Sequence, residues 1–186
     1  CDLIIMKYNK LPFVFFVFFF VFYLYKSKTT IIESFSSLIF KGPNIIQTWK
    51  DNNLPKKYKL LVDNVIKLNP YSNYMFFTDK DIDKFIKDKY PQYLNIFYNL
   101  PFTIQKIDFF RYLAVYYFGG VYLDLDILLF KSVKNISDNN KAVFPLEFSK
   151  NSDIILQKQG FNGLIGNYAF YSPKEHPFLQ KIINNI

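Results

Sequence analysis

Apolar and polar positions along the chain predict strands that alternate with helices. Apolar residues recur at helical spacing between positions 55 and 68, whereas residues 44–49 and 74–78 are short apolar runs with polar ends. Asp79 or Asp81 can cap a further helix that follows the second run. This alternation predicts a mostly parallel α/β sheet with helices on both faces, in which ligands bind beyond the carboxyl ends of the strands.

The second half of the chain centres on a long apolar segment that ends at two glycines. Residues 104–118 are apolar on nearly every side, which predicts a helix buried on most faces, with Thr103 as its N-cap. Gly119 supplies the left-handed conformation that closes this helix, and Gly120 permits a tight turn and the close approach of a ligand. An apolar strand is predicted over residues 121–126.

Two aspartates lie at the far end of that predicted strand. Residues two apart on a strand project from the same side, so Asp124 and Asp126 present two carboxylates in parallel if the strand extends that far. Like charges this close raise each other's pKa unless a cation lies beside them. Oxygen-only ligation suits Mg²⁺ or Mn²⁺, which proteins bind through one or two carboxylates and the phosphates of a substrate. The pair is therefore a candidate metal site.

Asp108 and Arg111 interrupt the long apolar helix three residues apart, so they share a face and can form an ion pair. A solvated pair at the helix edge is one interpretation. The apolar surroundings favour a defined role for both groups, because an unpaired charge there is costly. Arg111 is also the single arginine in a chain with 23 basic residues, and its planar fork binds carboxylate or phosphate in a way that lysine does not. We therefore expect Arg111 to position Asp108 or a ligand phosphate.

The C-terminal part predicts strands and one further helix. Residues 142–148 form a predicted strand, in which Glu147 is either a solvated side chain or an acceptor-side carboxylate. Residues 161–172 predict a loop and a strand, with Asn167 facing the site. His176, the only histidine, precedes a helix and is interpreted as structural.

The N-terminal segment is strongly apolar. Residues 11–25 carry no charge and have lysines on both sides, which favours an uncleaved signal anchor over a cleaved signal or a buried core segment. We therefore predict a membrane anchor over residues 1–26, a stem over 27–42 and a catalytic domain over 43–186 that continues beyond the last residue. We expect a single-pass membrane protein whose catalytic domain lies in the lumen of a Golgi-like compartment.

Charge and cysteine content narrow the classes of partner. The formal net charge is +8, but the lysines are scattered and form no arginine-rich arm, so nucleic acid is not an expected partner. A net positive charge suits an anionic ligand such as a nucleotide diphosphate, or an anionic membrane surface. One cysteine excludes an internal disulfide framework.

Several stretches resemble the glycosyltransferases of family 32, whose sugar-binding region contains the DXD motif and which include the fungal initiating α-1,6-mannosyltransferases. The chain departs from the family pattern in two places: Gln47-Thr48 stands where the family has His-Gln, and Ile107 stands where it has Ser. The stretches that carry the resemblance are residues 43–49 (PNIIQTW), 108–113 (DFFRYL), 119–126 (GGVYLDLD), 167–170 (NYAF) and 176–178 (HPF).

This resemblance implies a GT-A fold, a nucleotide-sugar donor, a divalent metal and retention of anomeric configuration. The transferred sugar would be mannose, galactose or an N-acetylhexosamine, and the acceptor a glycan or glycolipid. By position, Asp124 and Asp126 would be the catalytic and metal-binding pair. The donor-binding residues would be Asp108, Arg111, Gly120, Asp124, Trp49 and Asn167, although a lone tryptophan is more often a core aromatic.

Two other functions use a similar pattern. A haloacid-dehalogenase-like phosphatase also has Asp-x-Asp after an apolar strand and binds Mg²⁺, but its pattern has Thr or Val where this chain has Leu128. A membrane-anchored transferase remnant without activity is the second alternative.

Overall fold

The computed structural model describes residue 26 and residues 42–136, 140–147 and 164–186. The chain divides into two units, residues 1–41 and residues 42–186, and the second is considered below. The predicted anchor segment, residues 11–25, and nearly all of the predicted stem lie outside the described residues. Among the residues that are described, no helix combines the length and the apolar character needed to cross a bilayer.

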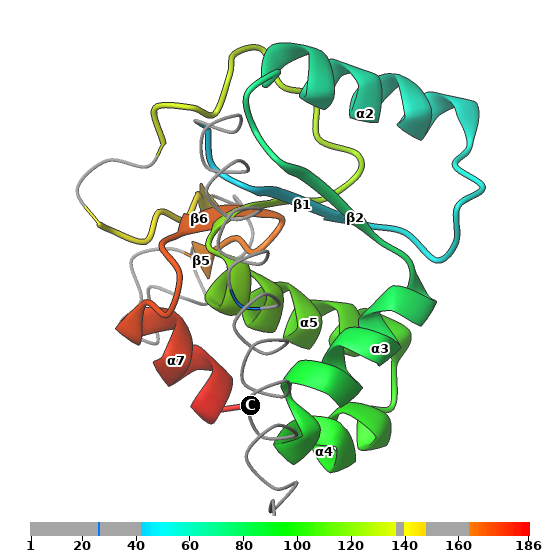
Figure 1. Cartoon of the computed structure of the whole chain (residues 1–186), viewed down its shortest axis with the longest axis vertical. Helices are drawn as coiled ribbons and strands as arrows, with labels where there is room; N and C mark the ends of the chain where they lie inside the picture. The colour runs from blue at the N-terminus through cyan, green and yellow to red at the C-terminus, as the bar shows by residue number, and fades with distance from the viewer. Residues whose placement is uncertain (1–25, 27–41, 137–139, 148–163) are drawn as a thin grey trace, which may run out of the picture. The chain divides into compact units, whose positions relative to one another are not determined.

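The second unit contains a central sheet and a set of helices around it (Figure 1). Its elements follow one another in the alternating order that the sequence predicts as far as β3. In chain order they are β1 (Ile45–Thr48), α2 (Lys56–Leu68), β2 (Tyr74–Phe77), α3 (Asp79–Lys89), the 3₁₀ turn η1 (Pro91–Tyr93), α4 (Leu94–Asn99), α5 (Thr103–Phe118), β3 (Gly120–Leu123), β4 (Leu146–Glu147), β5 (Leu164–Ile165), β6 (Ala169–Ser172) and α7 (Pro177–Asn184).

The main sheet has the strand order β2-β1-β3-β6. β1 pairs in parallel with β2 and with β3, and β6 pairs with β3 in the antiparallel direction. β4 and β5 form a separate two-stranded sheet. The prediction of a mostly parallel sheet is confirmed, with one antiparallel strand at the edge next to β3.

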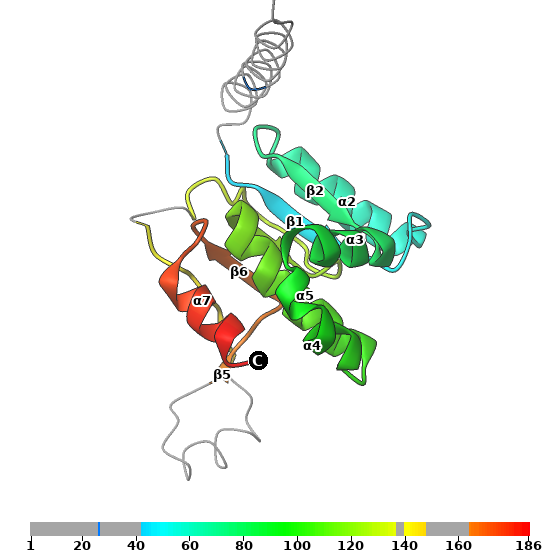
Figure 2. The ribbon, with the colours of Figure 1, turned by 60° about the horizontal axis from the view of Figure 1, so that its bottom comes forward.

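Alternate strand residues face two different apolar cores. Ile46 and Tyr122 pack with side chains of α3, α5 and α7, whereas Ile45 and Val121 pack with Val65 of α2. Helix α2 accordingly lies on one side of the sheet and α3, α4, α5 and α7 on the other (Figures 1 and 2). Because strand side chains alternate in direction, four-residue strands that are apolar throughout are buried on both faces.

Two predicted helix starts are wrong by one residue or more. Thr78, not Asp79 or Asp81, is the N-cap of α3: its hydroxyl accepts from the Asp81 amide (3.2 Å), and the Asp81 carboxylate accepts from the Thr78 amide (3.0 Å). Phe102, not Thr103, is the N-cap of α5, and its amide donates to Gln105 Oε1 (3.3 Å).

The strands after α5 are shorter than predicted. β3 ends at Leu123, so the expectation of a strand through Asp126 is wrong. Of the predicted strand over 142–148, the described part forms only Leu146–Glu147 and one isolated bridge at Val143. His176 is the N-cap of α7, where its Nδ1 accepts from the Phe178 amide (3.2 Å), which confirms a structural contact for this residue.

The glycine pair joins α5 to β3 and packs against β1. Gly119 has a φ of +67° and Gly120 a φ of +114°. A Cβ on Gly120 would collide with the backbone carbonyl of Asn44, which accepts from the Val121 amide (2.8 Å). The Asn44 side-chain amide also donates to the carbonyls of Phe118 (2.9 Å) and Gly119 (3.2 Å). Gly120 therefore permits the close approach of β1 rather than of a ligand.

We expect Gly120→Ala to lower the free energy of unfolding by about 2 kcal/mol or more, because it combines a positive φ with a backbone collision. Urea denaturation of the purified protein measures this change. Gly42→Ala is the matched control, since its Cβ would meet the Ser72 hydroxyl, a side-chain end that can rotate away. Equal losses in the two variants would contradict this account of Gly120.

Candidate active site

The carboxyl ends of β1, β2 and β3 meet at a cavity of about 340 Å³. Residues that follow each of these strands line it, as expected for a parallel sheet. The lining consists of Thr48, Trp49, Lys50, Tyr58, Asp79, Thr103, Ile104, Ile107, Arg111, Tyr122, Asp124, Leu125 and Asp126.

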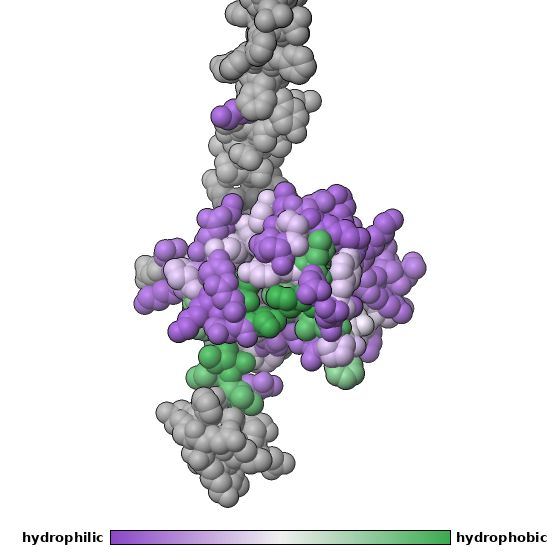
Figure 3. Space-filling view, turned by 90° about the horizontal axis from the view of Figure 1, so that it is seen from below, coloured by the Kyte–Doolittle hydropathy of each residue, from purple (hydrophilic) through white to green (hydrophobic). Residues whose placement is uncertain are grey.

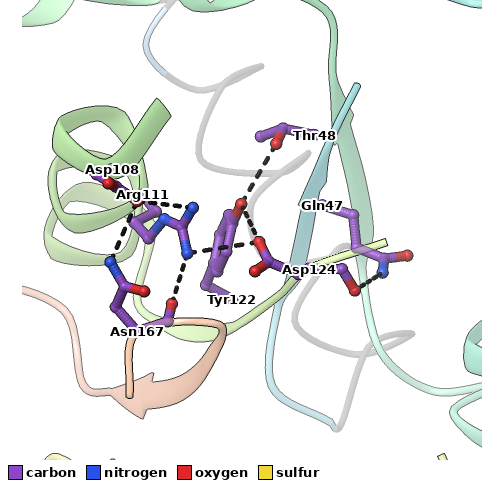
Figure 4. A network of polar contacts seen from close by, with 7 residues as sticks. All are labelled: Gln47, Thr48, Asp108, Arg111, Tyr122, Asp124 and Asn167. Carbon is purple, nitrogen blue, oxygen red and sulfur yellow. Dashed lines mark hydrogen bonds and ion pairs between the residues drawn. The ribbon is translucent and has the colours of Figure 1, made fainter. Parts of the chain in front are cut away.

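The guanidinium of Arg111 is buried at the wall of this cavity, and Figure 4 shows its polar contacts. The Arg111 side chain is 3% exposed, and its Nη2 lies 2.9 Å from Asp108 Oδ1. Its Nη1 donates to the Asn167 carbonyl (2.8 Å) and lies 3.4 Å from Asp124 Oδ1. The Asn167 amide closes the ring by donating to Asp108 Oδ1 (3.1 Å). The expected pair of Asp108 and Arg111 is confirmed, and its arginine is buried rather than solvated.

Tyr122 connects the guanidinium to the strand end. Its ring centre lies 4.6 Å from Arg111 Cζ, so the cation stands over the aromatic face. Its hydroxyl donates to Asp124 Oδ1 (3.0 Å) and lies 3.3 Å from Thr48 Oγ1. Burial raises the pKa of Tyr122, which keeps the phenol protonated as a donor.

Asp124 is held through both its side chain and its backbone. Burial raises the pKa of its carboxyl above the ordinary value, while Arg111 and the Tyr122 hydroxyl oppose that rise. The Asp124 carbonyl accepts from Gln47 Nε2 (3.2 Å). Gln47 is fully buried, and its Oε1 accepts from the Tyr74 hydroxyl (2.9 Å). The orientation of Asp124 thus depends on β1 and β2 as well as on β3.

Asp126 lies in the turn after β3, not on the strand. The Ile127 amide donates to the Asp124 carbonyl (3.2 Å), which closes this turn. Asp126 is exposed, whereas the Asp124 side chain is 33% exposed. The two carboxylates therefore do not project in parallel from a strand face, but both line the same cavity.

The carboxylates fit part of the shell of a hard divalent cation. In the described part of the chain, no group of three or more His, Cys, Asp and Glu side chains stands in position to hold a metal. Mg²⁺ and Mn²⁺ accept one or two carboxylates when substrate phosphates and water complete the shell. Asp124 and Asp126 suit such a shared site.

Not all of the other residues predicted to bind the donor lie at the cavity. Trp49 lines the cavity, and its ring lies 4.8 Å from that of Tyr58. Asp108 and Asn167 contact each other beside Arg111, and Gly120 packs against Asn44; none of these three residues lines the cavity.

Sequence reasoning missed several polar and aromatic residues of the site. Gln47 and Thr48 are two of the three positions that differ from the family pattern; Gln47 donates to the Asp124 carbonyl, and the Thr48 hydroxyl contacts that of Tyr122. Their place at the end of an apolar strand was the available signal. The missed residues are Gln47, Thr48, Lys50, Tyr58, Asp79 and Tyr122.

Comparison with known proteins agrees with this geometry. Residues 55–143 match the family described as "Glycosyltransferase sugar-binding region containing DXD motif". The chain is 32% identical over 150 residues to inositol phosphoceramide mannosyltransferase 1 of Schizosaccharomyces pombe, covering 78% of this chain and 43% of that protein. It is 33% identical over 129 residues to the initiation-specific alpha-1,6-mannosyltransferase of Candida albicans, covering 66% of this chain and 30% of that protein. The chain thus spans less than half the length of these fungal relatives.

A solved structure, titled PaToxG glycosyltransferase, has a similar fold. Its TM-score is 0.53 at 19% sequence identity, and the alignment covers 86% of this chain and 67% of that one. At this identity the likeness concerns the fold alone, which is GT-A-like. The resemblance to DXD glycosyltransferases, including fungal α-1,6-mannosyltransferases, is confirmed.

The phosphatase alternative is not supported. The region that contains the two aspartates matches a glycosyltransferase family instead. Asp124, the nucleophile in that alternative, follows the third strand of the unit and is engaged by Tyr122 and Arg111.

We expect Arg111→Lys to destabilise the fold by about 2–4 kcal/mol, because an ammonium cannot replace the fork that satisfies three partners in a buried position. Denaturant unfolding measures the loss. Lys84→Ala, at an exposed ion pair with Asp88, serves as a control that changes stability by less than about 1 kcal/mol. Wild-type stability in Arg111→Lys would contradict the proposed dependence on a guanidinium.

Asp124→Asn tests the raised pKa of Asp124. A carboxyl with a raised folded-state pKa loses stability as pH rises from its ordinary value through the folded value. Asparagine does not titrate, so the melting temperature of the variant relative to that of wild type should rise as the pH goes from about 4 to about 7. Thermal unfolding across this range measures the difference, and an advantage that grows toward acid pH would reverse the assigned sign.

Proposed function

Because residues 55–143 carry the DXD-containing sugar-binding region of the glycosyltransferases, we propose that this protein transfers a hexose from a nucleoside diphosphate sugar to a glycan or glycolipid acceptor. The observation that carries the proposal is the buried Arg111. It joins Asp108, Asn167 and Asp124 at a strand end, and Arg111, Asp124 and the exposed Asp126 line one cavity.

Two of the site residues would bind the diphosphate of the donor, and two others would bind its sugar. Asp124 and Asp126 would hold a divalent cation, which neutralises the diphosphate as it departs. Asp108 and Asn167 lie on the opposite side of Arg111 and offer carboxylate and amide oxygens for the hydroxyls of the donor sugar. The ion pair with Arg111 fixes the direction of the Asp108 carboxylate, so that it is already oriented when the sugar binds.

Mannose is the first sugar to test. The two fungal relatives are named as mannosyltransferases, and their names alone support this choice. Attack on the same face from which the diphosphate leaves would retain the anomeric configuration. Proton NMR of the first product formed would distinguish retention from inversion.

A lipid-linked acceptor suits the surface beside the cavity. Ile104 is 61% exposed and lines the cavity, and neighbouring Phe102 is 64% exposed. Figure 3 shows apolar residues gathered on one face of the unit and surrounded by hydrophilic ones. We further propose membrane association and a lumenal, Golgi-like location, in agreement with a lipid-linked substrate.

We expect Asp126→Ala to abolish metal-dependent donor binding and leave the fold intact, because Asp126 is exposed and supports no packing. Calorimetric titration of the full chain with GDP-mannose and UDP-sugars in the presence of Mn²⁺ measures binding, and circular dichroism checks the fold. Asp63→Ala, an exposed aspartate on α2, is the matched control and should bind as wild type does.

Unchanged donor affinity in Asp126→Ala would overturn the metal assignment. Failure of the wild-type chain to bind any nucleotide sugar with Mn²⁺ would favour the alternative of a transferase remnant without activity. Hydrolysis of the donor in a screen of nucleotide sugars would exclude that alternative.

A further inference from the structure

The two aspartates belong to a turn over residues 124–127 that follows β3. The Asp124 carbonyl accepts from the Ile127 amide (3.2 Å), so Leu125 and Asp126 are the central residues of this turn. Asp126 is exposed, and its carboxylate forms no hydrogen bond or ion pair with another described residue. Since no side-chain contact sets the direction of this carboxylate, its position follows the backbone of the turn.

A buried glutamine holds the first residue of the turn (Figure 4). Gln47 is 0% exposed, and its Nε2 donates to the same Asp124 carbonyl (3.2 Å). Because a carbonyl only accepts, the Gln47 amide must turn its nitrogen toward Asp124, which leaves Oε1 for the Tyr74 hydroxyl (2.9 Å). Burial raises the pKa of Tyr74, so its hydroxyl stays protonated as the donor. Tyr74 thereby fixes the orientation of Gln47.

An asparagine of α2 holds the segment that leaves the turn. Asn64 Oδ1 accepts from the amide of Leu129, three residues after Asp126 (3.1 Å). The side chains of Ile127 and Leu129 pack against the apolar core that contains Val65, the next residue of α2. The backbone that carries Asp126 is therefore held on both sides, by β1 before it and by α2 after it.

We propose that Gln47 and Asn64 are positioning residues for the divalent cation, which hold the turn in the conformation in which Asp124 and Asp126 reach one ion. This inference rests on the proposed function. Neither Gln47 nor Asn64 lines the cavity, and both act on backbone groups. A turn that is already ordered binds the ion without the loss of conformational entropy that a freely moving turn would suffer.

A second asparagine of α2 separates positioning from stability. Asn69 is 5% exposed, and its Oδ1 accepts from the Ser132 hydroxyl (2.9 Å) and the Val133 amide (2.8 Å). Asn69 thus holds the same segment as Asn64 does, but its contacts begin six residues after Asp126. If these contacts only stabilised the fold, removing the more deeply buried Asn69 would have the larger effect on cation affinity as well as on stability.

The test measures the affinity of the full chain for Mn²⁺. The electron paramagnetic resonance signal of free Mn²⁺ gives the dissociation constant for the ion alone, and calorimetry repeats the titration in the presence of GDP or UDP. Gln47→Leu and Asn64→Ala should each weaken Mn²⁺ binding by roughly tenfold, as is typical when groups that orient metal ligands are removed. Tyr74→Phe, which removes only the hydroxyl, should weaken it severalfold while the chain stays folded.

Asn69→Ala is the matched control. It should lower the urea midpoint of unfolding more than Asn64→Ala does, because it leaves two donors without their acceptor. It should nevertheless leave the affinity for Mn²⁺ unchanged. Ser132→Ala, which removes one of these donors, is a milder form of the same control. Circular dichroism checks that every variant is folded.

The outcomes separate this inference from the proposed function. Wild-type Mn²⁺ affinity in both Asn64→Ala and Tyr74→Phe would overturn the positioning role and leave the transferase proposal in place. An equal loss of affinity in Asn69→Ala or Ser132→Ala would reduce the effect to general stability and overturn the positioning role as well. Absence of Mn²⁺ binding by the wild-type chain, alone and with either nucleotide, would overturn the metal-dependent function itself.

Discussion

The site depends on one buried positive charge. A guanidinium at 3% exposure needs partners for its donors, and the two Nη atoms of Arg111 find them in three separate segments, whereas Nε has no hydrogen-bond partner in the described part of the chain. Asp108 lies one turn earlier on α5, Asp124 follows β3, and Asn167 precedes β6. The need to satisfy this charge fixes the distance between the helix, the strand end and the loop. Asp124, one of the residues that satisfy it, also lines the cavity, so the packing of this charge and the cavity share a side chain.

The parallel arrangement of β2, β1 and β3 decides which loops meet. Parallel strands deliver their carboxyl ends to one edge, and the connecting helices cover both faces. Contact between the Asn44 backbone and Gly120 sets β1 against β3, and the Gln47 side chain then reaches the carbonyl of Asp124. The orientation of the turn that contains Asp124 and Asp126 therefore depends on a contact made inside the sheet. The result is a cavity lined by Asp124 and Asp126 together with the aromatic side chains of Trp49 and Tyr58.

Local signals in the sequence predicted the long helices, although the short helix α4 was not predicted. Helical spacing of apolar residues predicted α2, and the nearly continuous apolar stretch before two glycines predicted α5 and its end at Phe118. Spacing also predicted the pair of Asp108 and Arg111, since residues three apart on a helix share a face. Local signals were less reliable at the ends of elements. Thr78, Asp79 and Asp81 are all of residue types that cap helices. Thr78 is the N-cap of α3 because its hydroxyl and amide exchange hydrogen bonds with the amide and carboxylate of Asp81.

The sequence by itself determined the order of strands and helices, the burial of α5, the location of the aspartate pair after an apolar strand, and the resemblance to DXD glycosyltransferases. These follow from residue type and spacing, which act over a few positions. Only the tertiary structure decided that β3 stops before Asp124, that Asn167 joins Arg111 from 56 residues away, and that Gly120 serves the sheet instead of a ligand. It also brought Trp49, Lys50 and Asp79 together with the aspartates. The physical reason is that these contacts depend on strand order and on the packing of distant segments, which no local pattern in the sequence specifies.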